Sequence, residues 1–184
     1  MKITMKNMTT LVLLTSFGVG GAIAKESNAE LRGPYLGQKS PGLTAEVFAP
    51  NIISTKGWEY GVVFAPNLKE MYMVREVNAD TKPEQQFVVY EQNEEVWNER
   101  VISKRIGTPT LSPDNKKMYF GRGYKERTKG GWSEMKRLGP DFEPYRIMRV
   151  TASIGGTIAF DEAGSDGNGV LRYAKMEHGK LTTP

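Results

Sequence analysis

The sequence predicts an all-β protein built from repeated hairpins. The main observation is a motif that occurs twice, as Phe64–Met73 and Leu111–Phe120, at an offset of 47 residues. The 20 glycines and 10 prolines are spread along the chain, which favours many turns over a few long helices. No segment after residue 24 shows a sustained helical periodicity of apolar residues, so little helix is expected.

The repeated motif has the physical features of a tight turn between two strands. Pro66 and Pro113 fix φ at the turn entry, and Asn67 and Asp114 can hydrogen-bond to their own backbone. The apolar residues that follow each turn begin a returning strand, so each copy is expected to form a β-hairpin. A weaker third copy, Ser153–Phe160, has two glycines in place of the turn residues.

A second hairpin is expected in each unit. A β-rich run, a polar turn and a return occur at 87–97 and at 170–181, and the segment 131–139 matches the outer strand of the middle unit. Two hairpins, or about four strands, in 40 to 47 residues are the period and strand count of propeller blades. The middle unit is short before Trp132, so a missing or reduced strand is expected there. The predicted units are 57–104, 105–148 and 149–184.

These motifs resemble those of the TolB-like, WD-like β-propeller repeat family. That family marks each blade with a Ser-Pro-Asp-Gly-Lys-x-apolar-Tyr-Phe hairpin and a later Gly-Trp-Ser-Glu-Pro type strand, which Ser112–Phe120 and Gly131–Glu134 match. The resemblance covers about residues 34–184 and implies about three four-stranded blades that form an incomplete, open β-propeller. The residues that carry the blade motif are Pro66, Asn67, Tyr72, Ser112, Pro113, Asp114, Tyr119, Phe120 and Trp132.

The turn glycine of that family is replaced here in both strong copies. Asn115 stands in its place in the second unit and tolerates a positive φ, so Asn115→Gly is expected to be neutral or to stabilise by up to ~1 kcal/mol. Leu68 stands there in the first unit, and leucine does not adopt a positive φ comfortably. The first turn is therefore expected either to differ in type or to be strained.

Residues 1–24 have the pattern of a cleavable signal peptide. Lys2 and Lys6 precede an apolar stretch, and Ala22-Ile23-Ala24 is a small-x-small cleavage site. The apolar stretch is shorter than the roughly 20 residues that span a bilayer, although an uncleaved anchor is an alternative. The sequence therefore predicts a periplasmic or secreted protein with no membrane span after cleavage and a mature chain that begins at Lys25.

Residues 25–56 are predicted to form an extended lead-in rich in proline and glycine, which lies across a core formed later in the chain. Its expected anchors are Tyr35, Leu36, Leu43, Val47 and Phe48. Propellers close with about four to eight blades, so three units leave blade faces bare. The sequence therefore predicts either part of a longer propeller or a homo-oligomer whose second copy completes the ring or stacks on the first. The apolar residues that need cover are Val62, Phe64, Ile158, Phe160 and Val170.

No catalytic residue and no cofactor is predicted. The single histidine, His178, is expected in an exposed turn, the chain has no cysteine, and no Gly-x-Ser-x-Gly segment occurs. Glu84, Glu94 and Glu95 are interpreted as solvated charges rather than as paired catalytic acids. The acidic segment that begins at Asp161 is interpreted as a polar loop, and a calcium site is the alternative. The candidate calcium ligands are Asp161, Glu162, Asp166 and Asn168.

The formal net charge of +4 does not indicate a nucleic-acid-binding protein. The densest basic stretch, Arg122–Lys129, is interpreted as solvated surface, because nucleic acids need a stripe that neutralises several phosphates. The function expected is a non-catalytic binding or scaffold module for a protein or peptide of the cell envelope, as the resemblance implies. The alternatives are a propeller remnant of an exported hydrolase or peptidase, and a carbohydrate-binding protein. The aromatic residues that could stack on sugars, but are expected to pack within and between units, are Trp58, Tyr60, Tyr72, Trp97, Tyr119, Trp132 and Tyr173.

Overall fold

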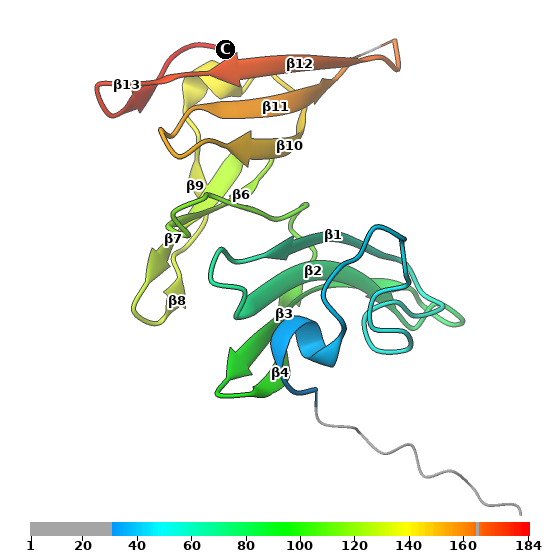
Figure 1. Cartoon of the computed structure of the whole chain (residues 1–184). Helices are drawn as coiled ribbons and strands as arrows, with labels where there is room; N and C mark the ends of the chain where they lie inside the picture. The colour runs from blue at the N-terminus through cyan, green and yellow to red at the C-terminus, as the bar shows by residue number, and fades with distance from the viewer. Residues whose placement is uncertain (1–30, 165) are drawn as a thin grey trace, which may run out of the picture.

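The computed structural model describes residues 31–164 and 166–184, and these residues form an all-β protein (Figure 1). They contain 14 strands and two short 3-10 segments, and no α-helix occurs among them. The predicted all-β class is therefore confirmed. The predicted signal peptide, residues 1–24, lies outside the described residues, as do the first residues of the lead-in.

The first sheet is a four-stranded antiparallel meander in which each strand pairs with the next along the chain. Its strands are β1 (Glu59–Phe64), β2 (Glu70–Val77), β3 (Glu84–Asn93) and β4 (Val96–Lys104). The runs Met71–Val74 and Phe87–Tyr90 are buried at every position. A strand that is buried on both faces needs cover on both, so this sheet lies between two other layers.

The second sheet is smaller, and its outer edge is divided between two short strands. The strands are β5 (Thr110–Leu111), β6 (Lys117–Phe120), β7 (Gly123–Thr128), β8 (Gly131–Trp132) and β9 (Lys136–Arg137). β8 pairs with the end of β7 and β9 with its beginning. Of the missing or reduced strand expected between Tyr119 and Trp132, the second alternative occurs, because β7 is present there but has 6 residues against 10 in β3. The 3-10 segment η2 (Pro140–Phe142) leads to the next sheet.

The third sheet has three strands, followed by a separate two-stranded hairpin. The strands are β10 (Ile147–Ala152), β11 (Ile158–Ala163) and β12 (Gly169–Ala174), then β13 (Met176–Glu177) and β14 (Lys180–Leu181). The sheet begins two residues before the predicted unit boundary at 149. The expected four-stranded unit is thus only partly formed here, because the last strands pair with each other and not with β12.

The three first hairpins share one turn geometry. Leu68, Asn115 and Gly156 occupy the same turn position, with φ values of 58°, 57° and 82°. The amide of each donates a hydrogen bond to the carbonyl oxygen three residues earlier, at 2.8, 2.9 and 3.0 Å. The first turn therefore does not differ in type from the second. Of the two alternatives for Leu68, the strained left-handed conformation is the one that occurs.

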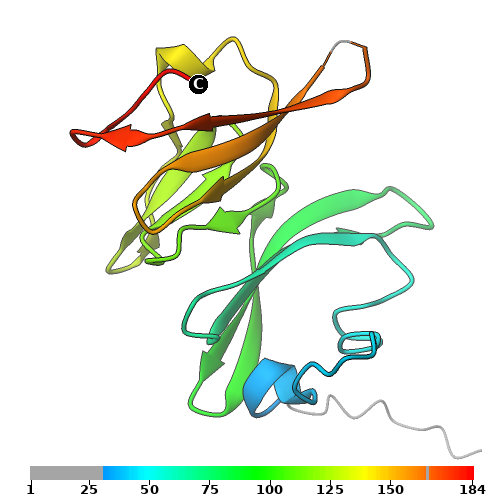
Figure 2. The same cartoon turned by 45° about the horizontal axis from the view of Figure 1, so that its top comes forward.

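The sheets follow one another in chain order (Figures 1 and 2). A hydrophobic core lies at each junction between them. Tyr72 on β2 points into the core between the first and second sheets, and Tyr119 on β6 points into the core between the second and third. Their neighbours along each strand point the opposite way, toward the preceding layer. In the third sheet Ala159 holds the position of these tyrosines, because Phe160 corresponds to Phe120.

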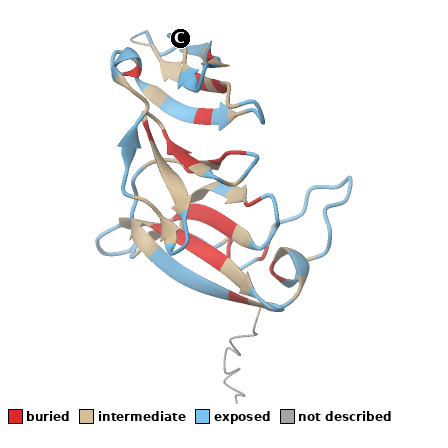
Figure 3. Cartoon of the chain, turned by 90° about the vertical axis from the view of Figure 1, so that its left-hand side faces the viewer, coloured by how far each residue is buried: buried red, intermediate tan, exposed pale blue. Residues whose placement is uncertain are grey.

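The lead-in covers the face of the first sheet that lies away from the second (Figure 3). Leu36, on the short segment η1 (Pro34–Gly37), is fully buried, and Trp97 on β4 donates a hydrogen bond from Nε1 to the Gly33 carbonyl oxygen at 2.7 Å. The predicted anchor Leu36 is confirmed, whereas Leu43 and Val47 are wrong because both are exposed. The buried residues of this layer and the sheet beneath it are Leu36, Ala49, Ile53, Met71, Met73, Val88, Tyr90 and Trp97.

Candidate functional site

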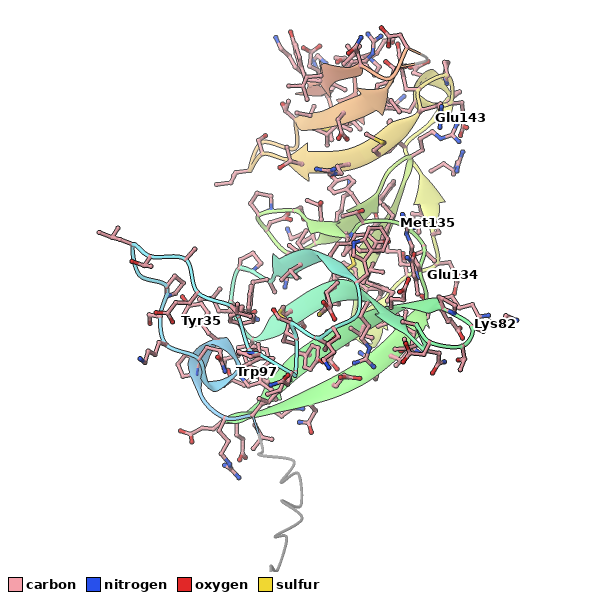
Figure 4. All side chains as sticks on the ribbon, turned by 90° about the vertical axis from the view of Figure 1, so that its right-hand side faces the viewer. Tyr35, Lys82, Trp97, Glu134, Met135 and Glu143 are labelled. Atoms are coloured by element: carbon pink, nitrogen blue, oxygen red, sulfur yellow. The ribbon has the colours of Figure 1, made fainter. Side chains whose placement is uncertain are left out.

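A cleft of about 920 Å³ lies where the beginnings of β1 and β10 meet the segment that leads into β5. Residues from all three sheets line it, so no single sheet could form it alone. Met135, which lines the cleft, and the nearby Glu143 lie along the same side of the molecule in Figure 4. The charged and aromatic residues that line it are Trp58, Tyr60, Arg105, Phe120, Arg122, Arg137 and Arg149.

Two glycines allow the sheets to approach closely at this cleft. Gly61 has φ 65°, and a Cβ atom there would lie 2.9 Å from the Cγ2 atom of Thr108. Gly121 has φ 58°, and a Cβ atom there would lie 2.9 Å from the Ile147 carbonyl oxygen. Both positions combine a left-handed backbone with a close contact to the next unit, so a larger residue would push the sheets apart.

Two of the four arginines hold a carboxylate from the loop after η2. Arg137 donates from Nε to Glu143 Oε1 at 2.9 Å and from Nη2 to both carboxylate oxygens at 2.6 and 2.7 Å. Arg122 Nη1 lies 3.3 Å from Glu143 Oε2 and donates to the Glu143 carbonyl oxygen at 2.7 Å. The hydrogen bonds from Arg137 lower the pKa of Glu143 below its usual value, so this carboxylate is ionised at neutral pH.

The other two arginines are less fully paired. Arg105 donates to the neutral amide oxygen of Gln85 at 3.0 Å, and its guanidinium lies 5.2 Å from the centre of the Tyr60 ring. No carboxylate within the described ranges forms an ion pair with Arg105. Arg149 is largely exposed, and its Nε atom is 3.9 Å from Asp161 Oδ2, at the limit of an ion pair.

The lining of the cleft therefore combines positive charge with an aromatic surface. It contains four arginines and no aspartate or glutamate. Trp58 is 56% exposed, and its ring centre is 4.8 Å from that of Tyr60. Planar guanidinium groups bind carboxylates or phosphates in a bidentate manner, and an exposed tryptophan offers an apolar face to a ligand. Such an arrangement can bind an anionic ligand that has apolar parts.

Two residues of the blade motif, Tyr72 and Trp132, meet at the junction of the first two sheets, and of the blade-motif residues only Phe120 also lines the cleft. Trp132 Nε1 donates to the Tyr72 hydroxyl at 3.0 Å, and the Arg127 guanidinium lies 4.0 Å from the Trp132 ring centre. Arg127 also donates to both carboxylate oxygens of Glu70, at 2.9 and 2.6 Å. Burial raises the pKa of Tyr72 to about 12, so its hydroxyl stays protonated and donates to Glu70. These residues join neighbouring units.

Asn115 belongs to the same junction. Its Oδ1 atom accepts a hydrogen bond from Arg127 Nη2 at 2.8 Å. The sequence could not reveal this bond, because Arg127 lies on another strand. The expectation that Asn115→Gly is neutral or stabilising is therefore replaced by an expected loss. The interpretation of Arg122–Lys129 as solvated surface is also wrong for Arg127, whose side chain is only 25% exposed.

The candidate calcium ligands are directed to protein partners. Asp161 accepts a hydrogen bond from the Arg149 backbone amide at 2.6 Å, and Glu162 pairs with Arg172 at 2.6 Å. Asp166 accepts both a backbone and a side-chain hydrogen bond from Asn168. Neighbouring residues of a strand point to opposite faces, so Asp161 and Glu162 cannot share an ion. Within residues 31–164 and 166–184, no three acidic, histidine or cysteine side chains are grouped to hold a metal ion.

Of the other residues considered from the sequence, some are buried in the cores and others are exposed. His178 is exposed in the turn between β13 and β14, as expected. The prediction that the aromatic residues pack is confirmed for Tyr72, Trp97 and Tyr119, which are buried. It is wrong for Trp58 and for Tyr173, which is 60% exposed.

The sequence assigned no binding residues, so the cleft arginines were missed. One feature could have identified three of the cleft residues. Arg105 and Arg149 are the first residues of the second and third predicted units, and Trp58 is the second residue of the first. Equivalent positions of successive units converge at one end of a repeat array, so charged or aromatic residues there indicate a shared surface.

Comparisons with protein-family models, with curated proteins and with solved structures give no match to this chain. In the part of the chain that the structure describes, no helix has the length and apolar character needed to cross a membrane. The arguments for function therefore come from the cleft and from the arrangement of the sheets.

Proposed function

We propose that this chain is a non-catalytic binding module of the TolB-like β-propeller type, which acts in the periplasm or outside the cell. It binds a protein or peptide partner of the cell envelope in the cleft between its three sheets. The proposal of export depends on the signal-peptide pattern of residues 1–24.

The arrangement of the sheets supports an open, partial propeller. The three sheets are antiparallel and follow chain order, and the first strands of successive sheets, β1, β5 and β10, lie beside one another. Each junction contains a core made from the facing surfaces of two sheets. This is the relation that adjacent blades have around a central axis.

The observation that carries the proposed function is the position of the cleft. It lies at the end of the sheets where all three first strands or their lead-in segments begin, and it has exposed Trp58 and four arginines. Concave surfaces between repeats, with aromatic and arginine side chains, are typical of protein recognition. No reaction is assigned to the cleft, because its lining contains no candidate nucleophile and base in contact with each other.

A membrane-spotted library of random peptides, incubated with the purified protein, tests the proposal. We expect a subset of peptides to bind, and Trp58→Ser to abolish that binding because it removes the exposed aromatic surface of the cleft. Tyr173→Ser is the matched control, since Tyr173 is equally exposed but lies outside the cleft. Binding that survives Trp58→Ser but is lost in Tyr173→Ser would place the partner elsewhere and contradict the proposal.

A further inference from the structure

One carboxylate of the chain itself lies beside the cleft and binds two of its arginines. Glu143 receives two hydrogen bonds from Arg137 Nη2 and one from Nε, all between 2.6 and 2.9 Å, and lies 3.3 Å from Arg122. The geometry is the bidentate one in which guanidinium groups bind carboxylates most strongly. The arginines at this side of the cleft are therefore arranged for a carboxylate.

Two more arginines offer donors that the chain does not neutralise fully. Arg105 has only the neutral Gln85 and the Tyr60 ring beside it among the described residues, and Arg149 meets Asp161 only at 3.9 Å. A guanidinium has five donor N–H groups, so most of those on Arg105 and Arg149 are available to a ligand. The cleft thus has two arginines, Arg122 and Arg137, that Glu143 balances, and two others, Arg105 and Arg149, whose charge is less fully balanced.

The small number of incompletely balanced arginines suits a short acidic segment better than a nucleic acid. A nucleic-acid site neutralises many phosphates along a basic stripe, whereas only two arginines here lack a close carboxylate. The exposed Trp58, whose ring centre is 4.8 Å from that of Tyr60, adds an apolar contact to the charged ones. Side chains that alternate between carboxylate and apolar groups would match both features.

We infer that the cleft is specific for an acidic peptide segment, with Arg105 and Arg149 binding its carboxylates and Trp58 contacting one of its apolar side chains. This inference rests on the binding function proposed above and names its ligand class. Glu143 competes in this arrangement, because it occupies the donors of Arg122 and Arg137 that a longer acidic segment would otherwise reach.

Fluorescence anisotropy with three labelled peptides of equal length tests the inference. The peptides alternate tyrosine with glutamate, with glutamine or with lysine. The glutamate peptide is expected to bind at least about tenfold more tightly than the glutamine peptide, since two charge-assisted contacts are added. The lysine peptide is expected not to bind.

Three single substitutions locate the effect. Arg105→Gln and Arg149→Gln are each expected to weaken binding of the glutamate peptide by about fivefold, and Lys129→Gln, which removes the same charge from an exposed turn outside the cleft, is expected to leave it unchanged. Glu143→Gln is expected to increase the affinity by about threefold, because it releases the donors of Arg122 and Arg137. A gain in affinity cannot arise from misfolding.

Four results would overturn the inference. The first is equal affinity for the glutamate and glutamine peptides, and the second is an equal loss of affinity for the glutamate peptide in Lys129→Gln and in the two arginine variants. The third is no gain of that affinity in Glu143→Gln. The fourth is tighter binding of a labelled single-stranded oligonucleotide that has the same charge as the glutamate peptide. If the glutamine peptide binds as well and Trp58→Ser abolishes it, the peptide-binding function stands and only the acidic specificity fails. If no peptide of any charge binds, both fail.

Discussion

The two outer faces of this molecule differ although the sheets beneath them begin with the same kind of hairpin. The outer face of the first sheet is covered by the lead-in, with Leu36 and Trp97 buried. The outer face of the third sheet, which carries Ala159, Leu171 and Tyr173, has no layer over it among the described residues. Leu171 is 85% exposed and Tyr173 60%. Figure 2 shows β10–β12 at the end of the molecule opposite to the lead-in.

The difference follows from the second strand of each unit, which packs one face against the preceding layer and turns the other toward the following sheet. Met71 and Met73 on β2, and Ile158 and Phe160 on β11, face the preceding layer and are buried. The lead-in therefore takes the place of a preceding sheet for the first unit. On the opposite face the tyrosine of the first two units becomes Ala159 in the third, which removes the side chain that would reach into a following sheet.

This asymmetry separates the two geometries of the homo-oligomer that the sequence predicts. A closed ring of two copies joins the third sheet of one copy to the first sheet of the other, and the lead-in occupies that face. A face-to-face pair uses only the third sheets and leaves both lead-ins in place. We therefore expect any homodimer to be the stacked pair, with an isologous interface.

The largest expected effect is on the covered face. Leu36→Ala should destabilise the protein by about 3 kcal/mol, because a fully buried leucine is replaced and a cavity remains between the lead-in and the first sheet. Leu43→Ala, the same substitution at a fully exposed position of the lead-in, is the control and should cost less than about 0.5 kcal/mol. Urea unfolding followed by circular dichroism measures both. Equal midpoints would mean that the lead-in does not cover the sheet.

The junction between the first two sheets should show the next largest effect. Arg127→Met should cost about 2 kcal/mol, because Glu70, whose side chain is 19% exposed, loses a bidentate partner. Arg100→Met breaks the more exposed pair with Glu91, in which the arginine side chain is 57% exposed, and should cost less than about 1 kcal/mol. The urea midpoints of the two variants show which substitution destabilises the protein more. A larger loss in Arg100→Met would contradict the role of Arg127 in joining the sheets.

Acid should weaken the first sheet through Glu99 on β4. Burial alone would raise the pKa of Glu99, but hydrogen bonds from Arg75 and Tyr90 outweigh it and lower that pKa. A lowered folded-state pKa gives a stabilisation that is complete above the unfolded value, about 4.3, and is lost as the pH falls through the folded value. Urea midpoints measured from neutral pH to about pH 3 should fall less steeply in Glu99→Gln than in the wild type. Parallel curves for the two proteins would exclude this contribution.

The sequence predicts local features of this fold well, because their causes are local. Proline followed by Asn67 or Asp114 produces the hairpin turn directly, and the alternation of apolar residues after it determines the strand. The expected strain at Leu68 also depends only on its own φ. Such features need no knowledge of what lies on the other side of the sheet.

Features that depend on contacts between units could not be predicted in the same way. Leu36 and Leu43 are identical in type and close in sequence, yet one is buried and the other exposed. The charge pattern around Arg127 predicts a solvated basic stretch, whereas the Arg127 side chain bridges two sheets through Glu70. The cleft arginines come from four separate segments, so their convergence depends on how the sheets are placed relative to each other.

Substitutions at the turn position that Leu68 and Asn115 share should change the stability less, and in opposite directions. Leu68→Asn should stabilise the protein by about 1 kcal/mol, because Leu68 is exposed and asparagine tolerates the left-handed conformation better. Asn115→Gly should instead cost about 1 kcal/mol, since the bond to Arg127 is lost. Opposite shifts of the urea midpoint are expected. Shifts of the same sign would show that backbone strain, and not the bond to Arg127, determines stability at this position.

The open face should show the smallest effect on folding and a clear one on assembly. Replacing Leu171 and Tyr173 by serine should change the free energy of unfolding of the monomer by less than about 0.5 kcal/mol, because both side chains are already exposed. If two copies stack through this face, the same double substitution removes its apolar contacts and converts the dimer to a monomer. Size-exclusion chromatography with light scattering distinguishes the dimer from the monomer, and Leu43→Ser is the control at an exposed leucine elsewhere.

A dimer that withstands the double substitution would exclude the third sheet as the interface. A wild-type protein that is monomeric over the whole accessible concentration range would mean that the exposed leucine and tyrosine do not suffice for self-association.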